Sequence, residues 1–298
     1  MKKFLSLVNF GMCTASIFPF IIGNLYSYYY YRQFNLLPIL IFAISMLSLN
    51  FVVNILDNCE DYKEYKQLDE NNEMQANALY KYGVSLKSAR NLIYLLLMIF
   101  AISGISLVFI SGWPILLMGI VSLFIGICYS QGKHPLSRYP IGEAASGLIM
   151  GFVIILAVVY LNTFQNQFNW IDFWKTFLVS LPCNMWISNI LLANNICDEQ
   201  ADKKMGRRTI VYFIGKRKSL NSFSVNNVIA LLAIVASVFL RLLPWESILI
   251  LLLIPFIIQQ SKLLYAKQDK QDTFLSSVKI MMLCSLAYMV TLIIGLLF

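Results

Sequence analysis

A chain of 298 residues in which 59% are hydrophobic and only 13% are charged has too little polar surface for an ordinary soluble domain. Its mean hydropathy of +0.70 places it in a bilayer. The net charge of +8 then suits contact with anionic lipid headgroups, and it argues against a nucleic-acid-binding protein. We therefore expect a membrane protein whose partner is the lipid bilayer and not nucleic acid.

Nine apolar runs separated by polar segments predict an all-α polytopic membrane protein, because a membrane-spanning helix needs about 20 mostly apolar residues. Lys2 and Lys3 precede the first run as they would in a signal peptide. No small-residue cleavage site follows, so we interpret that run as the first transmembrane helix. The nine predicted transmembrane helices cover residues 10–26, 34–56, 91–110, 113–129, 141–161, 173–193, 228–243, 245–259 and 280–298.

Basic residues give the orientation, because the cytoplasmic segments of membrane proteins are enriched in Lys and Arg. With the N-terminus inside, the inner segments hold 20 of the 23 Lys and Arg residues, and only Arg32, Lys175 and Arg241 lie elsewhere. The inner segments are residues 1–9, 57–90, 130–140, 194–227 and 260–279. We predict a multi-pass cell-membrane protein with a cytoplasmic N-terminus.

Cysteine and histidine usage excludes several classes of site. The six cysteines are scattered and include no Cys-x-x-Cys pair, so we expect no disulfide framework. His134 is the single histidine, which excludes a zinc framework and a histidine-based catalytic triad. We interpret His134 as an ordinary loop residue.

Two short stretches share the pattern N-x-x-D-x-x-x-D: NILDNCED at residues 54–61 and NICDEQAD at residues 195–202. They follow the second and sixth predicted helices, so both emerge on the same side of the membrane. This placement indicates a faint internal repeat of two four-helix units, with a ninth helix completing the bundle around a central cavity. No linker or soluble domain interrupts the pattern, and we predict one transmembrane domain over residues 1–298.

Carboxylates and amides share one helix face in each stretch if the helix continues through it, because the spacings are three and four residues. If the two faces meet, the carboxylates repel one another unless a cation lies among them, and Mg²⁺ prefers such oxygen ligands. The predicted metal ligands and catalytic residues are Asp57, Asp61, Asp198 and Asp202. The predicted supporting oxygen donors are Asn54, Asn58, Asn194 and Asn195.

A magnesium site of this kind predicts a phosphorylated substrate, since Mg²⁺ is usually held by a few carboxylates together with substrate phosphates. Basic residues near both motifs can meet the remaining phosphate charge. The predicted phosphate-binding residues are Lys133, Arg138, Lys203 and Arg207. The alternative is that the acidic residues only cap and solvate helix ends, but the matched position of the two motifs favours a site.

The longer stretch NNICDEQADKKMGRRT, residues 194–209, resembles the second aspartate motif of the UbiA superfamily of intramembrane aromatic prenyltransferases. It is most similar to the form N-N-x-x-D-x-x-x-D-x-x-x-G-[KR]-x-T of the menaquinone-type members. DNCEDYKEY resembles the first motif, and YSQGKHPLSRYPIGEAASG resembles the segment after the fourth helix. The helix count, motif order and spacing agree, so the resemblance covers most of the chain.

The first motif departs from the usual family form N-D-x-x-D-x-x-x-D. Asp57 and Asn58 stand in reversed order, and Tyr65 occupies the position of a common third aspartate. Cys197 stands where menaquinone-type members often carry arginine. These departures affect the full set of metal ligands and the acceptor, and they leave the class of metal site intact.

The resemblance implies Mg²⁺-dependent transfer of a polyprenyl group from polyprenyl diphosphate to an aromatic ring. The implied acceptor is 1,4-dihydroxy-2-naphthoate, prenylated with loss of CO₂ in menaquinone biosynthesis. Within the same family, the alternative acceptor is 4-hydroxybenzoate or another aromatic ring. Aromatic side chains beside the motifs can stabilise an allylic cation, although interfacial anchoring or packing is the alternative for each. These candidates are Tyr62, Tyr65, Tyr129, Tyr139 and Trp186, and Tyr129 is among the predicted substrate-binding residues.

A secondary transporter is the main alternative from another class of protein. It is expected to carry ionisable groups or broken helices near the middle of the membrane, whereas the spans predicted here carry almost no charge and the polar motifs lie at their inner ends. A non-catalytic scaffold leaves the paired acidic motifs without a role. The inner segments 57–90 and 194–227 are long for helix connections, and we expect them to close over the diphosphate. We expect Glu143, five residues after Arg138, to pair with it.

Overall fold

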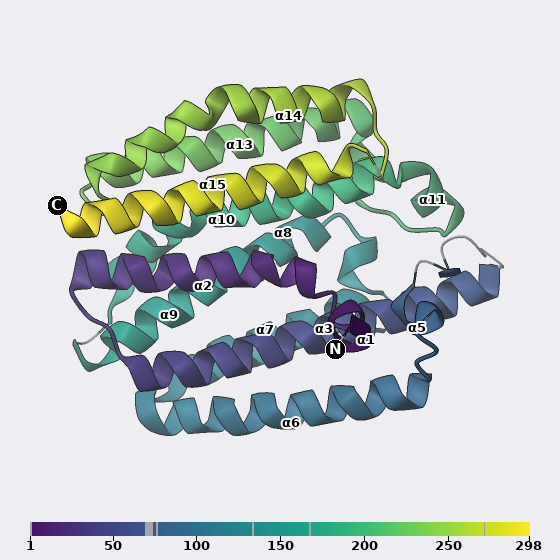
Figure 1. Ribbon diagram of the computed structural model, residues 1–298, viewed down its shortest axis with the longest axis horizontal. Helices are drawn as coiled ribbons and strands as arrows, with labels where there is room; N and C mark the ends of the chain where they lie inside the picture. The colour runs from purple at the N-terminus through teal and green to yellow at the C-terminus, as the bar shows by residue number, and fades with distance from the viewer. Residues whose placement is uncertain (1, 69–73, 76, 133, 167, 271) are drawn as a thin grey trace. The chain divides into compact units, whose positions relative to one another are not determined.

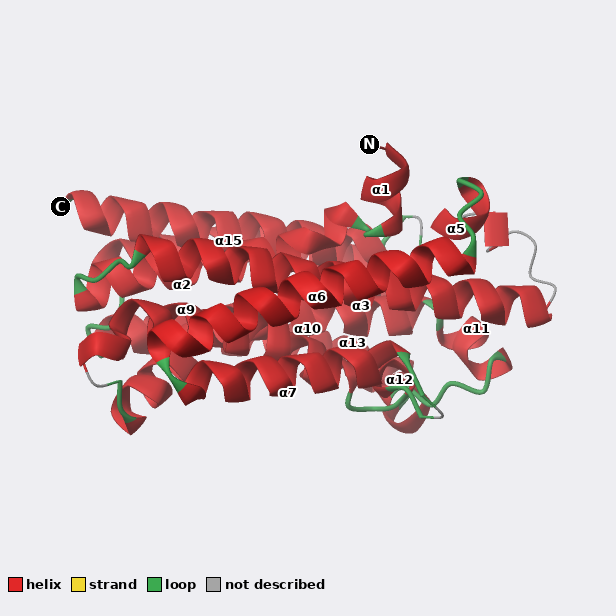
Figure 2. Ribbon diagram, turned by 90° about the horizontal axis from the view of Figure 1, so that it is seen from below, coloured by secondary structure: helices red, strands yellow, loops and turns green. Residues whose placement is uncertain are grey.

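The computed structural model describes residues 2–68, 74–75, 77–132, 134–166, 168–270 and 272–298. Regular secondary structure in these residues is helical throughout (Figure 2). Nine of the helices described there are long and apolar enough to cross a membrane, which confirms the predicted fold class and number of spans. They cover Phe10–Tyr31, Leu36–Lys66, Leu86–Ser111, Trp113–Ser130, Gly142–Asn166, Trp170–Cys197, Lys216–Phe239, Trp245–Ala266 and Phe274–Leu297.

Large apolar side chains remain exposed along these helices. Phe109 is 88% exposed and Phe124 is 66% exposed, although both lie within membrane-length helices. Such side chains would be costly in water, whereas a hydrocarbon environment accommodates them, and the helices satisfy their backbone polar groups internally. The protein is a multi-pass membrane protein.

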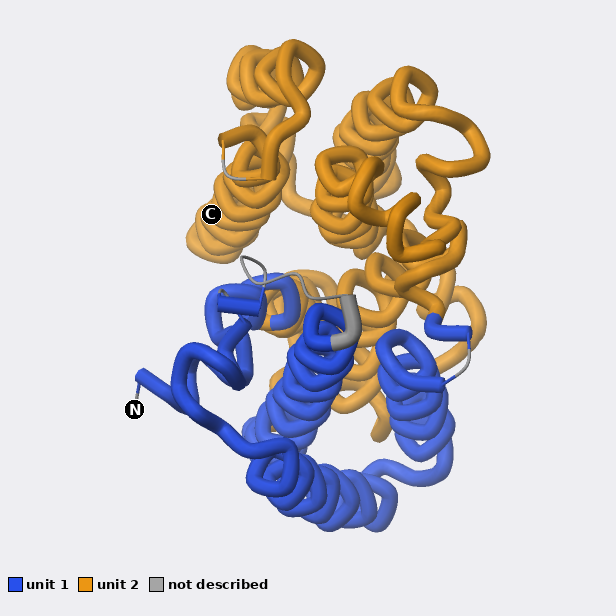
Figure 3. Tube along the Cα trace, turned by 90° about the vertical axis from the view of Figure 1, so that its right-hand side faces the viewer, with its two compact units in different colours: residues 1–16, 36–135 blue, residues 17–35, 136–298 orange. Residues whose placement is uncertain are grey.

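The chain forms two compact units (Figure 3): unit 1 is Met1–Ser16 with Leu36–Pro135, and unit 2 is Ile17–Asn35 with Leu136–Phe298. This grouping differs from the predicted division after the fourth helix, because most of the first span belongs with the later helices. A close contact at Gly23 accounts for the difference. A Cβ atom there would lie 3.0 Å from the side chain of Val158, so glycine lets the first span pack tightly within unit 2.

Unit 1 is built around α3, which packs against α6 and α7 (Figure 1). Beside the first motif, Val52 and Ile55 of α3 share one buried cluster with Val8 and Leu79. This cluster holds the N-terminal segment and α5 against α3. The helices of unit 1 are α1 (Lys2–Leu7), η1 (Phe10–Cys13), α3 (Leu36–Leu68), α5 (Ala78–Lys81), α6 (Leu86–Ser111) and α7 (Trp113–Ser130).

Unit 2 is built around α10, which packs against α13, α15 and η4. Trp186 of α10 is fully buried, and Tyr288 of α15 donates a hydrogen bond to the carbonyl of Val179 at 3.0 Å. The helices of unit 2 are α2 (Thr14–Tyr26, which begins in unit 1), η2 (Ser27–Tyr31), η3 (Leu136–Arg138), α8 (Gly142–Ser146), η4 (Gly147–Val153), α9 (Ile154–Thr163), η5 (Phe164–Asn166), α10 (Trp170–Cys197), α11 (Glu199–Lys204), α12 (Ile210–Ile214), α13 (Lys216–Phe239), η6 (Trp245–Leu253), α14 (Ile254–Ala266) and α15 (Phe274–Leu297).

Two glycines bring the segment α8–η4 into backbone contact with α10. A Cβ atom at Gly147 would lie 2.6 Å from the carbonyl oxygen of Asn184, and one at Gly151 would lie 2.5 Å from the Cα atom of Asn184. Real Cβ atoms do not approach backbone so closely, so both positions require glycine. The contact fixes α8, and with it Glu143, beside α10.

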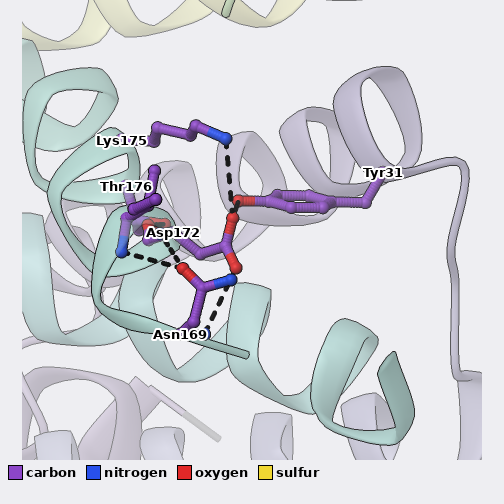
Figure 4. Close-up of polar contacts among 6 residues, drawn as sticks. Tyr31, Asn169, Asp172, Lys175 and Thr176 are labelled. Carbon is purple, nitrogen blue, oxygen red and sulfur yellow. Dashed lines mark hydrogen bonds and ion pairs between the residues drawn. The ribbon is translucent and has the colours of Figure 1, made fainter. Parts of the chain in front are cut away.

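The first turn of α10 carries a polar clamp that holds the end of the first span (Figure 4). Asn169 and Asp172 form a reciprocal capping box at the start of α10. The Asp172 carboxylate accepts a hydrogen bond from the Tyr31 hydroxyl at 3.0 Å and lies 3.7 Å from the Lys175 ammonium. The clamp lies at the end of α10 opposite the second motif, so it supports the fold and not the candidate site.

Candidate active site

The first motif lies entirely on α3, as predicted. The helix continues to Leu68, beyond the predicted end at residue 56, and an ion pair of 2.6 Å between Glu60 and Lys63 lies on this extension. Asp57 is exposed, whereas Asn54, Asn58 and Asp61 are half-buried on the same helix. Spacings of three and four residues place these four side chains on one face of α3.

The two amides of the first motif hold the N-terminal segment. Asn54 donates to the carbonyl of Val8 at 2.8 Å, and Asn58 donates to the carbonyl of Leu7 at 3.1 Å. Their N–H groups are therefore engaged by backbone, which leaves the carboxamide oxygens as the groups that can act as oxygen donors. The sequence did not reveal this tethering role, because it joins residues far apart in the chain.

The segment expected to close over the diphosphate is partly packed in unit 1. Asn77 donates to the backbone carbonyl of Asn58 at 3.0 Å and caps α5, and Leu79 is buried in the core cluster. Residues 69–73 and 76 of this segment lie outside the described residues. The described part of this segment is thus attached directly to the first motif.

The end of α7 contacts the first motif. Ser130 donates to Asp57 Oδ1 at 3.1 Å, and Gln131 donates to Glu60 Oε1 at 2.9 Å. Tyr129 is half-buried in the last turn of α7, one residue before Ser130. Its placement agrees with the expected neighbourhood of the motif, whereas the predicted phosphate-binding residue Lys133 lies outside the described residues.

The second motif crosses a helix junction. α10 ends at Cys197, Asp198 adopts a non-helical conformation, and α11 begins at Glu199. Helical hydrogen bonding nevertheless continues through the junction. The backbone N–H of Asp198 donates to the backbone carbonyl of Asn194 at 2.9 Å, and the backbone N–H of Asp202 donates to the backbone carbonyl of Asp198 at 2.8 Å. The predicted continuous helix is therefore replaced by two helices that meet at Asp198.

Burial differs along the second motif. Asn195 and Asp202 are each 4% exposed, whereas Asn194 and Asp198 are half-buried. A buried carboxylate or amide is stable only with polar or cationic partners. The contacts of Asn195 and Asp202 therefore decide how this motif works.

Glu143 is a site residue whose contact the sequence did not predict. Asn195 donates to Glu143 Oε1 at 2.7 Å, and the other carboxylate oxygen of Glu143 is buried with no hydrogen-bond partner among the described residues. The expected partner was Arg138, but the glycine contact turns α8 so that Glu143 lies against α10. The backbone carbonyl of Arg138 instead accepts from the Arg208 amide at 2.9 Å.

Cations surround the second motif. Lys270 donates to Asp198 Oδ2 at 2.6 Å, and Arg207 Nη1 lies 3.8 Å from Asp202 Oδ1. Lys203 donates to Glu199 at 2.8 Å, which lowers the pKa of the Glu199 carboxyl below its usual value. Arg207 is thus close to a motif aspartate as predicted, and Lys270, 72 residues from Asp198, was not anticipated.

The donor set of each motif fits a hard divalent ion. Within the described part of the chain, no three His, Cys, Asp or Glu side chains lie together closely enough to hold a metal by themselves. Each motif instead offers two carboxylates one helical turn apart with amide oxygens beside them. Mg²⁺ needs no more from a protein, because phosphates and water commonly complete its coordination.

The sequence matches the UbiA prenyltransferase family over residues 16–286. The chain therefore belongs to this family, and it is a membrane-embedded prenyltransferase. Among its relatives is the 1,4-dihydroxy-2-naphthoate octaprenyltransferase of Bacillus subtilis (strain 168), to which it is 27% identical over 225 residues. That alignment covers 76% of this chain and 70% of the relative.

Solved structures show the same fold. A UbiA homolog from Aeropyrum pernix K1 superposes with a TM-score of 0.69 at 17% identity, covering 93% of this chain and 97% of that one. A UbiA homolog from Archaeoglobus fulgidus bound to GPP and Mg²⁺ superposes with a TM-score of 0.69 at 13% identity, covering 98% and 99%. At these identities the likeness establishes the fold alone.

Proposed function

We propose that this prenyltransferase transfers a polyprenyl group from polyprenyl diphosphate to 1,4-dihydroxy-2-naphthoate, with loss of CO₂, in Mg²⁺-dependent menaquinone biosynthesis. The observation that carries the proposal is the pair of matched motifs, each with two carboxylates and amides on or beside one helix face. The printed activity of the Bacillus subtilis relative supports the acceptor. The GPP and Mg²⁺ bound to the Archaeoglobus fulgidus homolog support the donor and the ion.

Four aspartates would hold Mg²⁺, namely Asp57, Asp61, Asp198 and Asp202. When bound, the ion neutralises the diphosphate oxygens and so makes the diphosphate a better leaving group. The carboxamide oxygens of Asn54 and Asn58 can accept hydrogen bonds from metal-bound water, because backbone contacts already engage their N–H groups. Asn194 and Asn195 would do the same at the second motif.

Cationic side chains would bind the diphosphate. Arg207 lies near Asp202, and Lys203 pairs with Glu199, the residue after Asp198, so both are placed beside the second motif. Their hydrogen bonds to phosphate oxygens strengthen as charge develops on the departing diphosphate. Arg138 and Lys133 are assigned to the same role from their place in the sequence.

Prenyl transfer joins the allylic carbon of the donor to the carboxyl-bearing ring carbon of the acceptor. The bond from that allylic carbon to diphosphate oxygen breaks, and its electron pair leaves with the diphosphate. Loss of CO₂ then returns an electron pair to the ring and restores aromaticity. The developing allylic cation must be kept from water, and Tyr129 beside Ser130 can present an aromatic face to it.

We further propose that the protein resides in the cell membrane with its N-terminus and site on the cytoplasmic side. The strong bias of Lys and Arg toward the predicted inner segments supports this orientation. Asn77, which links α5 to the first motif, would couple the inner segment of unit 1 to substrate binding.

A transfer assay with competing acceptors tests the proposed substrate. Purified protein would receive labelled polyprenyl diphosphate and Mg²⁺, with 1,4-dihydroxy-2-naphthoate in one reaction and 4-hydroxybenzoate in another. We expect labelled lipid and CO₂ release from the naphthoate only, and none with EDTA. Transfer to 4-hydroxybenzoate instead would keep the enzyme class and reject the acceptor, and transfer to neither ring by folded protein would favour another role.

A further inference from the structure

Unit 2 contains an apolar groove that lies outside the candidate site. It has a volume of about 870 Å³ and runs along α13, α14 and the end of η6. Almost every lining side chain in its deeper part is aliphatic, including Leu231, Val235 and Leu251. Neither aspartate motif contributes to the lining, so the groove is separate from the candidate site.

The length of the groove matches one leaflet of a bilayer. Along α13 it extends from Ser224 to Val235, which is about 16 Å at 1.5 Å per residue. The hydrocarbon core of a bilayer is about 30 Å thick, so a chain in the groove would reach about the bilayer middle. This depth suits one acyl chain of a phospholipid.

The shallow end of the groove is polar and positively charged. Lys262 lines it four residues before the end of α14, and it forms no ion pair among the described residues. The Tyr265 hydroxyl donates to the side-chain oxygen of Asn221 at 3.0 Å and lies 3.3 Å from the Ser224 hydroxyl. These contacts join α13 to α14 beside this lysine. The lining includes no carboxylate to neutralise Lys262.

We propose that this groove binds an anionic phospholipid, with one acyl chain along the aliphatic wall and the phosphate at Lys262. A single lysine matches the net charge of −1 of a lipid such as phosphatidylglycerol, whereas phosphatidylcholine has no net charge because its choline cation offsets the phosphate. A diphosphate carries more charge, and it would call for further cations or for carboxylates that hold a metal. Lysine stems that lie along apolar surface with the ammonium at the interface are well suited to lipid headgroups. This site does not depend on the proposed acceptor or reaction.

Native mass spectrometry of the detergent-purified protein tests the site. The protein would be titrated with phosphatidylglycerol or with phosphatidylcholine of the same acyl chains. We expect preferential retention of phosphatidylglycerol, and we expect Lys262→Gln to lower phosphatidylglycerol binding about fivefold while phosphatidylcholine binding stays unchanged. Leu232→Trp fills the groove and should reduce the binding of both lipids.

Lys279→Gln is the matched control, because Lys279 is an exposed lysine of the same unit that does not line the groove. This control should bind both lipids as the wild type does, and all variants should elute as monodisperse protein. Equal losses of phosphatidylglycerol binding in Lys262→Gln and Lys279→Gln would show that only the overall surface charge matters, and would overturn the proposed site. Displacement of phosphatidylglycerol by polyprenyl diphosphate, with Leu232→Trp abolishing diphosphate binding, would overturn the proposed occupant.

Discussion

Glu143 decides which way the carboxamide of Asn195 is turned. A carboxylate accepts hydrogen bonds and repels a carbonyl oxygen, so the NH₂ group of Asn195 faces Glu143 at 2.7 Å and its oxygen faces the other way. Both residues are buried, which prevents water from replacing the bond. Glu143 is therefore a positioning residue for the second motif.

Replacing Glu143 separates this positioning role from simple packing. Glu143→Leu leaves the Asn195 NH₂ group buried without its partner, which costs about 1–3 kcal/mol, so we expect kcat/KM for prenyl transfer to fall about tenfold or more. Glu143→Gln keeps an oxygen that can accept the bond and should retain most of the activity. Transfer kinetics and thermal unfolding would be measured on both variants, and equal activity of the two would reject the role.

The Glu199 carboxyl supplies a pH-dependent contribution to stability. Its pKa is lowered chiefly by the hydrogen bond from Lys203, with a further contribution from Lys216 at 3.2 Å. A carboxyl with a lower pKa in the folded state stabilises the fold above its unfolded pKa and loses that effect as pH falls through the folded pKa. The contribution of such a partly exposed pair is below about 1 kcal/mol.

We therefore expect Glu199→Gln to unfold at a slightly lower temperature than the wild type at pH 7. The difference should close as pH falls below the usual carboxyl pKa of 4.5. Thermal unfolding in detergent across this pH range measures it. A difference that stays constant with pH would show that the carboxyl charge is not its source.

The sequence singled out the residues of the candidate site, whose role stays a prediction, but it did not indicate their contacts. The two motifs and their amides follow from spacing, because residues three or four apart share a helix face whatever the tertiary structure. Glu143 and Lys270 contact Asn195 and Asp198 across 52 and 72 residues, and no local pattern encodes such pairs. The joint action of the two motifs on one metal-bound diphosphate stays a prediction.

At the scale of helices, hydrophobic runs predicted the nine membrane-length helices found in the described residues, but not where those helices end. α3 extends past its apolar run because Glu60, Lys63 and their neighbours favour helix without being apolar. The break at Asp198 was not predicted, since the pattern of side chains continues through it. The grouping of the first span with later helices also escaped prediction, because it depends on the close contact at Gly23.

The close contact of η4 with α10 predicts that a larger residue at Gly151 disrupts helix packing. Gly151→Ala places a methyl group against the backbone of Asn184, where neither helix can yield without moving, so we expect a strong loss of folded protein. Gly104→Ala is the matched control, because nothing lies within 4 Å of a Cβ atom at that position of α6. The control should be neutral or slightly stabilising. Yield of monodisperse protein and thermal unfolding would report both, and similar behaviour of the two variants would contradict the close contact.

At the scale of the whole molecule, each compact unit carries one aspartate motif. In unit 1 the motif is held by the N-terminal segment, α5 and the end of α7. In unit 2 it is held by Glu143 of α8 and by Lys270, which lies between α14 and α15. The two units thus share one motif each, although they contain different numbers of helices.

The most direct test is the initial rate of prenyl transfer as a function of Mg²⁺ in Asp57→Asn and Asp198→Asn. We expect each variant to lose about 100-fold or more in rate, as when a group that stabilises developing charge is removed. Two controls accompany them: Asp272→Asn, an exposed carboxylate that pairs with Lys267, and Lys270→Gln, which breaks the Asp198 ion pair but keeps the carboxylate. Both controls should remain far more active than the motif variants, and a motif variant that transfers prenyl groups at the wild-type rate would contradict the account.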